Sequence, residues 1–119
     1  MQYLLMLHTK ESDWANLTAD QQRERSVPYQ AYMEALKKAG AYLGSNRLLP
    51  VANGRTVRTA NGKTQVLDGP YADTKEQCGG YFLIDVPDLD SALSWAARCP
   101  GASHGVVEVR PVWQMPGPG

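Results

Sequence analysis

The distribution of apolar and polar positions predicts two helices and several short strands in a repeating order. Apolar runs of strand length alternate with two segments in which apolar residues recur at helical spacing. The order is strand, helix, strand, hairpin, strand, helix, strand; without the hairpin it consists of two strand–helix–strand halves. This order predicts an α+β ferredoxin-like sandwich, in which an antiparallel sheet carries both helices on one face. The predicted strands outside the hairpin are residues 2–8, 41–49, 81–86 and 106–112.

Capping signals mark the ends of the two predicted helices. Thr18 and Gln21 have the spacing of a capping box, and Gly40 is placed to end the first helix in a left-handed conformation. Pro28 lies inside this helix, where it either kinks the helix or begins a second segment. Asp88 is a suitable N-cap for the second helix.

A hairpin separates the two halves. Asn61-Gly62 lies between the predicted strands 56–59 and 63–67, and this dipeptide favours a type I′ turn because both residues must adopt positive φ. Residues 68–77 and residues 9–17 are polar and are expected to form loops.

The sheet face away from the helices has a mixed composition, which predicts a homodimer. Two helices cover one face of a four-stranded sheet, and no third helix is predicted for the other. Pairing of two such faces about a two-fold axis would bury them and leave a polar-lined cavity between the subunits. The alternative is a monomer with an exposed amphipathic face. The residues predicted on this face include Tyr81, Leu83, Asp85, Val106, Glu108 and Arg110.

Composition narrows the function classes. The chain has 119 residues, 12 Lys plus Arg and 12 Asp plus Glu, so its net charge is zero and no nucleic-acid partner is expected. No apolar run is long enough to span a membrane or to serve as a signal peptide, so we expect a cytoplasmic protein with Cys78 and Cys99 as free thiols. Residues 1–113 are expected to form one domain, followed by a Pro/Gly-rich tail over residues 114–119.

Three residues are candidate catalytic groups. His8 lies at the end of the first strand, and an imidazole titrates near neutral pH, but a hydrogen-bonded structural histidine fits the same position. Asp68 could act as a general base, or its carboxylate could hold the turn at Gly69-Pro70. His104 precedes the last strand, where a solvated loop histidine is the structural alternative.

Three further residues are candidate substrate-binding groups. Tyr71 and Tyr81 could orient a substrate through their hydroxyl groups, or pack as ordinary aromatic residues. Arg110 could bind an anionic ligand, or form an ion pair with Glu108. No metal or cofactor is expected, because the two histidines are isolated and the Gly79-Gly80 pair lacks the spacing of a phosphate loop.

One stretch resembles a known family. Residues 68–77, with the sequence DGPYADTKEQ, and the following GGYF of residues 79–82 are similar to the signature of the YCII-related proteins, DGPF-type branch, with Tyr71 at the position of the usual Phe. The resemblance extends to residues 88–96 and 105–111. It implies a dimeric α+β barrel of ferredoxin-like subunits.

The resemblance implies little about activity. Many DGPF-type proteins are encoded beside extracytoplasmic-function sigma factors, and one member of the wider family is a dehydrochlorinase of a chlorinated hydroxyhydroquinone. A His–Asp active site with the histidine on the first helix is proposed for the YCII branch, but residues 19–39 contain no histidine. The sequence thus predicts a small-molecule cavity with cofactor-independent acid/base chemistry: elimination, isomerisation or cyclisation. The alternative is a non-catalytic ligand-binding or regulatory module associated with a sigma factor.

Overall fold

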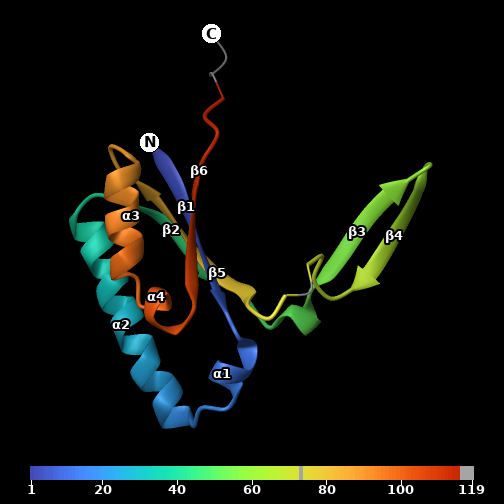
Figure 1. Cartoon of the computed structure of the whole chain (residues 1–119), viewed down its shortest axis with the longest axis horizontal. Helices are drawn as coiled ribbons and strands as arrows, with labels where there is room; N and C mark the ends of the chain where they lie inside the picture. The colour runs from blue at the N-terminus through green and yellow to red at the C-terminus, as the bar shows by residue number, and fades with distance from the viewer. Residues whose placement is uncertain (73, 116–119) are drawn as a thin grey trace.

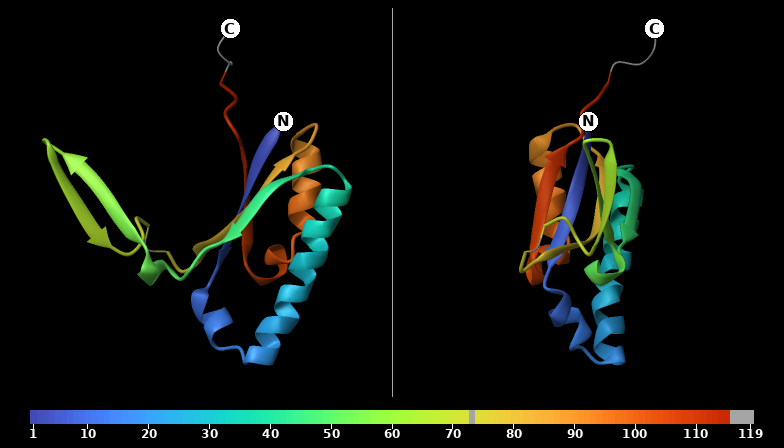
Figure 2. Two further views of the ribbon diagram at one scale, coloured as in Figure 1. Left: turned by 180° about the vertical axis from the view of Figure 1, so that it is seen from behind. Right: turned by 90° about the vertical axis from the view of Figure 1, so that its right-hand side faces the viewer.

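Four strands form one antiparallel sheet in the computed structural model, which describes residues 1–72 and 74–115. The spatial order is β2–β5–β1–β6, and helices α2 and α3 lie together on one face (Figures 1 and 2). This arrangement confirms the predicted α+β ferredoxin-like fold. The elements are β1 (Gln2–Thr9), α2 (Ala19–Lys38), β2 (Tyr42–Arg47), β5 (Gln77–Asp85), α3 (Leu89–Arg98) and β6 (Val106–Pro111).

Alternation along the central strands determines which side chains enter the core. In β1, Tyr3, Leu5 and Leu7 are buried against the helices, while the residues between them are only half-buried. They pack with Leu36 of α2 and Ile84 of β5, both fully buried. The core therefore lies between the sheet and the two helices.

Burial favours the protonated form of two side chains in this core, Tyr32 and Cys99. The Tyr32 hydroxyl donates to the carbonyl of Trp95 at 2.7 Å, and burial raises the pKa of the Tyr32 phenol. Burial also raises the pKa of the Cys99 thiol, which keeps this cysteine protonated and unreactive.

The predicted helix ends are observed. The Thr18 side chain accepts from the Gln21 amide and the Gln21 side chain accepts from the Thr18 amide, which completes the capping box. Gly40 has φ +73° just after α2, and Asp88 accepts from the Ser91 amide at 2.8 Å. Pro28 lies within a single continuous helix, so a second segment does not begin there.

Three short helical elements were not predicted: α1 (Glu11–Ala15), the 3-10 helix η1 (Val51–Asn53) and α4 (Gly101–His104). The expected loop at residues 9–17 thus contains α1, and His104 ends a short helix rather than lying in a loop. Tertiary contacts connect α1 to the segment after β2: the Arg47 guanidinium lies 3.9 Å from the Trp14 ring centroid, and Glu11 accepts the Val51 amide at 2.7 Å. Such contacts between distant segments leave no periodic signal in the sequence.

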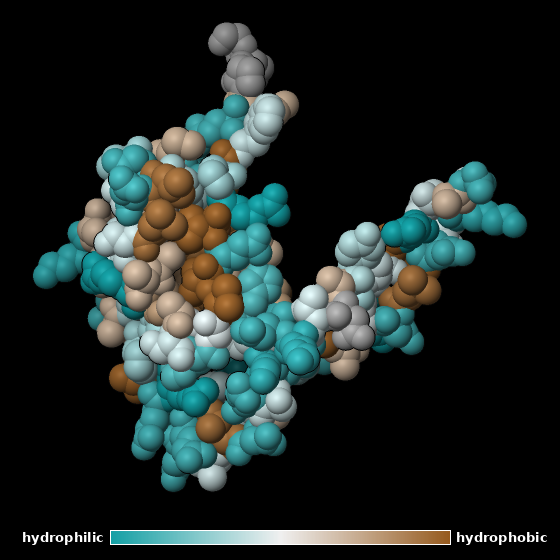
Figure 3. All heavy atoms as spheres, in the orientation of Figure 1, coloured by the Kyte–Doolittle hydropathy of each residue, from teal (hydrophilic) through white to brown (hydrophobic). Residues whose placement is uncertain are grey.

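The hairpin extends away from the main sheet. Strands β3 (Arg55–Ala60) and β4 (Lys63–Asp68) pair with each other as a separate two-stranded sheet, and the space-filling view shows them standing clear of the body (Figure 3). Asn61 and Gly62 have φ of 52° and 75°, as the predicted turn requires. We call residues 55–68 the hairpin arm.

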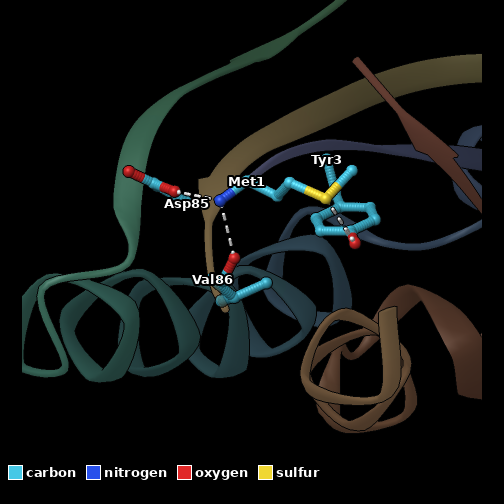
Figure 4. A network of polar contacts seen from close by, with 4 residues as sticks. All are labelled: Met1, Tyr3, Asp85 and Val86. Carbon is cyan, nitrogen blue, oxygen red and sulfur yellow. Dashed lines mark hydrogen bonds and ion pairs between the residues drawn. The ribbon is translucent and has the colours of Figure 1, made fainter. Parts of the chain in front are cut away.

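The N-terminal residue is attached to the end of β5. Its ammonium donates to Asp85 Oδ1 at 3.0 Å and to the Val86 carbonyl at 2.9 Å (Figure 4). The Tyr3 hydroxyl lies 3.5 Å from the Met1 sulfur. Asp85 is therefore occupied at the far end of the sheet from His8.

Trp113, at the end of the predicted domain, and Met115, in the predicted tail, are exposed; residues 116–119 of the tail lie outside the described part of the chain. No helix in the described residues is long and apolar enough to cross a membrane.

Candidate functional site

The sheet face opposite the helices carries three of the six candidate residues, His8, Tyr81 and Arg110. We call it the open face. The strand register places Leu4 between Leu83 and Arg110, and Met6 between Tyr81 and Glu108. Leu4, Met6, Tyr81 and Leu83 are half-buried, whereas the β6 residues are exposed. The open face is thus apolar along its middle strands and charged along β6.

His8 and Glu108 form a hydrogen-bonded pair on this face. The distance between His8 Nε2 and Glu108 Oε1 is 3.1 Å, and the two side chains are 24% and 46% exposed. A carboxylate can only accept here, so Nε2 carries the proton and a neutral His8 ring keeps its lone pair on Nδ1. Glu108 therefore orients the ring and selects its tautomer.

A glycine allows the strands that carry this pair to approach. A Cβ on Gly105 would lie 2.1 Å from the carbonyl oxygen of His8 and 2.9 Å from the Thr9 side chain. No larger residue fits there without moving β6 away from β1.

Tyr81 has a partner of its own on the open face. Its hydroxyl accepts a hydrogen bond from Asn46 Nδ2 at 2.7 Å, across the β2–β5 pair. Arg110 lies on the same face, next to Leu4. His8, Tyr81 and Arg110 therefore share one face. Alternation in the sequence predicted this for Tyr81 and Arg110, but it placed His8 only on the side of its strand shared with Leu4 and Met6.

A wide groove begins where the open face meets the base of the hairpin arm. Its volume is about 1180 Å³, and it lies between the end of β1, residues 47–57 and the described part of residues 69–78. The groove brings His8 and Tyr71 together on its lining. Its other polar lining residues include Arg47, Arg55, Lys75 and Cys78.

Cationic side chains outnumber anionic ones on the described lining of the groove. The cations are Arg47, Arg55 and Lys75, of which Arg55 is paired with Asp68, and the carboxylate is that of Glu76. Arg47 also stacks on Trp14, and Arg58 lies 5.9 Å from the Tyr71 ring centroid. A concave surface with more positive than negative groups attracts acidic small molecules.

Of the other two catalytic candidates, Asp68 lies next to residues of the groove lining and His104 lies at the end of α4. The Asp68 side chain is 92% exposed and its Oδ1 lies 3.1 Å from Arg55 Nε, so it closes the base of the hairpin arm. His104 is exposed at the end of α4. Neither is among the residues that line the groove beside His8.

The interpretation of the sequence missed Glu108 as the partner of His8, and it did not consider Asn46 or Arg47. Glu108 was considered only against Arg110. The missing information was that β6 lies directly beside β1, which brings residues 100 positions apart into contact. The ferredoxin-like strand order contains this adjacency and could have been used to find the pair.

Comparisons with known proteins agree with this fold. The chain is 41% identical over 92 residues to "Uncharacterized protein R00369" of Rhizobium meliloti (strain 1021), which covers 76% of this chain and 71% of that protein. It is also similar to the solved structure of 5-chloro-2-hydroxyhydroquinone dehydrochlorinase (TftG) from Burkholderia phenoliruptrix AC1100 in complex with 2,5-dihydroxybenzoquinone. The TM-score is 0.54 at 15% identity, with 98% of this chain and 96% of that chain covered, which shows a shared fold.

The family assignment comes from the sequence profile of the YCII-related domain, which matches residues 1–116. This match concerns the family as a whole, and the DGPF-type branch remains a prediction. Because the profile covers nearly the whole chain, the protein belongs to the YCII-related domain family.

Proposed function

We propose that this protein is a homodimer that binds an acidic, hydroxylated ring compound in the groove and transfers a proton through His8. The observation that carries the proposal is the 3.1 Å contact between His8 and Glu108 at the edge of a groove with a positive balance of charge. General acid/base chemistry requires at least one oriented proton-transfer group, here an imidazole, beside a concave binding site.

In this proposal His8 is the catalytic residue and Glu108 is a positioning residue. His8 Nδ1 takes a proton from a carbon or oxygen of the ligand, and Glu108 stabilises the imidazolium through Nε2. In an elimination, the electron pair of the broken C–H bond forms the new double bond, and the leaving group departs with its own electron pair. The proton then returns from His8 to solvent, so the reaction needs no electron acceptor.

The proposed ligand class follows from the charge of the groove. Ionised phenol or hydroxyquinone oxygens would be attracted by Arg47, Arg55 and Lys75, and the Tyr71 ring could stack on a planar ligand. The dehydrochlorinase of the same fold is solved with 2,5-dihydroxybenzoquinone, a compound of this class.

Pairing of two copies is part of the proposal. Leu4, Met6 and Leu83 form an apolar strip on the open face. A second open face would bury this strip and place Tyr81 and Arg110 inside the interface, near the grooves. The roles of Asp68 and His104 remain predictions, as does the association with a sigma factor.

The test uses 2,5-dihydroxybenzoquinone as the probe. Calorimetry should detect binding, and proton NMR in D₂O should detect protein-dependent exchange of the ring C–H. His8→Gln should lower the exchange rate by about 100-fold or more, with binding retained. Glu108→Gln should lower the rate less, because the ring stays in place.

His104→Gln is the matched control, since it removes the other histidine without touching the groove. It should leave binding and exchange unchanged; a lower exchange rate would instead support the catalytic role that the sequence predicts for His104. Binding without exchange would favour the ligand-binding or regulatory module over the enzyme. Absence of binding to quinones and acidic phenols would contradict the proposed ligand class.

A further inference from the structure

The hairpin arm has apolar side chains that nothing in the described part of its own chain covers. Val57 and Val66 face each other across β3 and β4 and are 62% and 61% exposed. A single two-stranded hairpin is only marginally stable in water. The arm therefore lacks the packing partner that a stable hairpin requires.

The overall dimensions also indicate that the arm is not packed against the body. The radius of gyration is 16.6 Å, whereas a compact domain of this length has roughly 13.5 Å. The arm extends beyond the end of the main sheet and, seen from the side, stands in front of the open face (Figure 2, right). Space-filling spheres show empty space between the arm and the body (Figure 3). The Val57–Val66 face of the arm and the open face of the sheet therefore border the same empty space, and no described residue of the chain fills it.

We propose that a second copy of this chain occupies that space, and that the Val57–Val66 face of each arm packs on the body of the other copy. This inference rests on the pairing of open faces proposed above and adds the arm to it. The arm is then an intersubunit clasp, and the base of the arm that forms one wall of the groove is fixed in place only in the dimer.

Charge favours a copy of the same chain as the occupant. The arm carries Arg55, Arg58 and Lys63 against Asp68, for a net charge of +2. Because the whole chain has zero net charge, the remainder carries −2, so each arm is attracted to the other copy's body.

The open face is self-complementary in the same sense. Glu108 and Arg110 alternate on β6 and have opposite charges. A two-fold rotation can place Glu108 of one copy near Arg110 of the other, which a symmetric pair does twice.

Sedimentation velocity over a wide range of protein concentration tests the arm. Val66→Asp should weaken the dimer by about tenfold or more. The matched control is Gln65→Asp, which adds the same charge to the neighbouring position, also exposed, on the opposite face of β4 and should leave the dimer nearly unchanged. Circular dichroism checks that both variants are folded.

Hydrogen exchange gives a second measurement on the unmodified protein. Amides of residues 56–67 should exchange more slowly at concentrations where the dimer forms. Equal exchange at low and high concentration, with a dimer present, would overturn the arm's role.

Arg110→Glu separates this inference from the proposed dimer itself. If Arg110→Glu weakens the dimer and Val66→Asp does not, the open faces pair and the clasp is wrong. A wild-type protein that remains monomeric throughout would overturn both. A wild-type protein that dimerises but does not bind 2,5-dihydroxybenzoquinone would contradict the proposed ligand class. The proposed role of the arm as a clasp would still stand.

Discussion

The body and the hairpin arm both consist of short antiparallel strands but are stabilised differently. In the body, every second residue of β1 is buried, and Leu5 and Ile84 have no exposed surface. In the arm, all six residues of β4 are exposed. Strand formation therefore does not decide burial, which depends on what packs against the strand.

The turn determines the shape of the arm, and the core determines the shape of the body. Asn61-Gly62 sets the register of β3 against β4 without help from other elements. The register of β1, in contrast, follows from the need to place its apolar residues under the helices. The four predictions below test this contrast, in order of decreasing effect.

Ile84→Ala should destabilise the protein most. Removing a fully buried side chain costs about 2–5 kcal/mol in the free energy of unfolding, through lost burial and a cavity. Val66→Ala in the arm should cost no more than about 0.5 kcal/mol in the monomer, as for most exposed sites. Urea denaturation at low protein concentration measures both. Similar losses would show that the arm packs within its own chain.

Gly105→Ala should have the next largest effect, at the edge of the body near the site. Its Cβ would collide with the His8 carbonyl, and overpacking of this kind costs about 1–3 kcal/mol. Displacement of β6 should also separate Glu108 from His8 and lower proton exchange on the quinone. Gly44→Ala, where a Cβ has open space, is the control. Equal behaviour of the two variants would contradict the close approach.

Gly62→Ala should affect the arm alone. An alanine at φ +75° is strained by about 1–2 kcal/mol, so the amides of β3 and β4 should open more often. The free energy of unfolding of the body should stay unchanged. Asn61→Gly keeps positive φ accessible and serves as the control. Hydrogen exchange by NMR distinguishes the two regions, and faster exchange in β1 or β5 would show that arm and body unfold together.

Asp88→Asn should produce the smallest effect, and one that depends on pH. The Ser91 backbone amide, and then its side chain, lower the pKa of Asp88 below 3.8. Because the folded-state pKa is lower than the unfolded one, the stabilisation is complete above about pH 4 and is lost as pH falls through the folded-state value. The wild type should thus melt slightly higher at neutral pH, and the difference should vanish in acid. If the difference in melting temperature between wild type and Asp88→Asn is the same at every pH, it does not come from ionisation of Asp88.

Signals between neighbouring residues were sufficient to predict the ends of the two long helices and the turn of the hairpin arm. The capping box of α2, the cap at Asp88 and the Asn61-Gly62 turn each involve residues within three positions of one another. Their energetics depend on neighbouring residues along the chain, so they can be predicted without a fold. The short helices α1 and α4 were missed because a single turn has too few residues to show a period.

The candidate site depended on tertiary structure. Alternation placed Tyr81 and Arg110 on one face, but the face of His8 and the grouping of the three proposed catalytic residues could not be derived from sequence alone. His8 and Glu108 meet because β6 lies beside β1, whereas Asp68 pairs with Arg55 at the base of the arm. Contacts between segments about 100 residues apart are set by strand order.

By itself, the sequence determined the strands, the helix caps, the turn of the arm and, through the order of these elements, the ferredoxin-like class. Only the tertiary structure decided that His8 has Glu108 as its partner, that a groove opens at the base of the arm, and that the arm stands away from its own sheet. The physical reason is range: caps and turns are short-range hydrogen bonds, whereas a site is formed by packing that brings distant segments together.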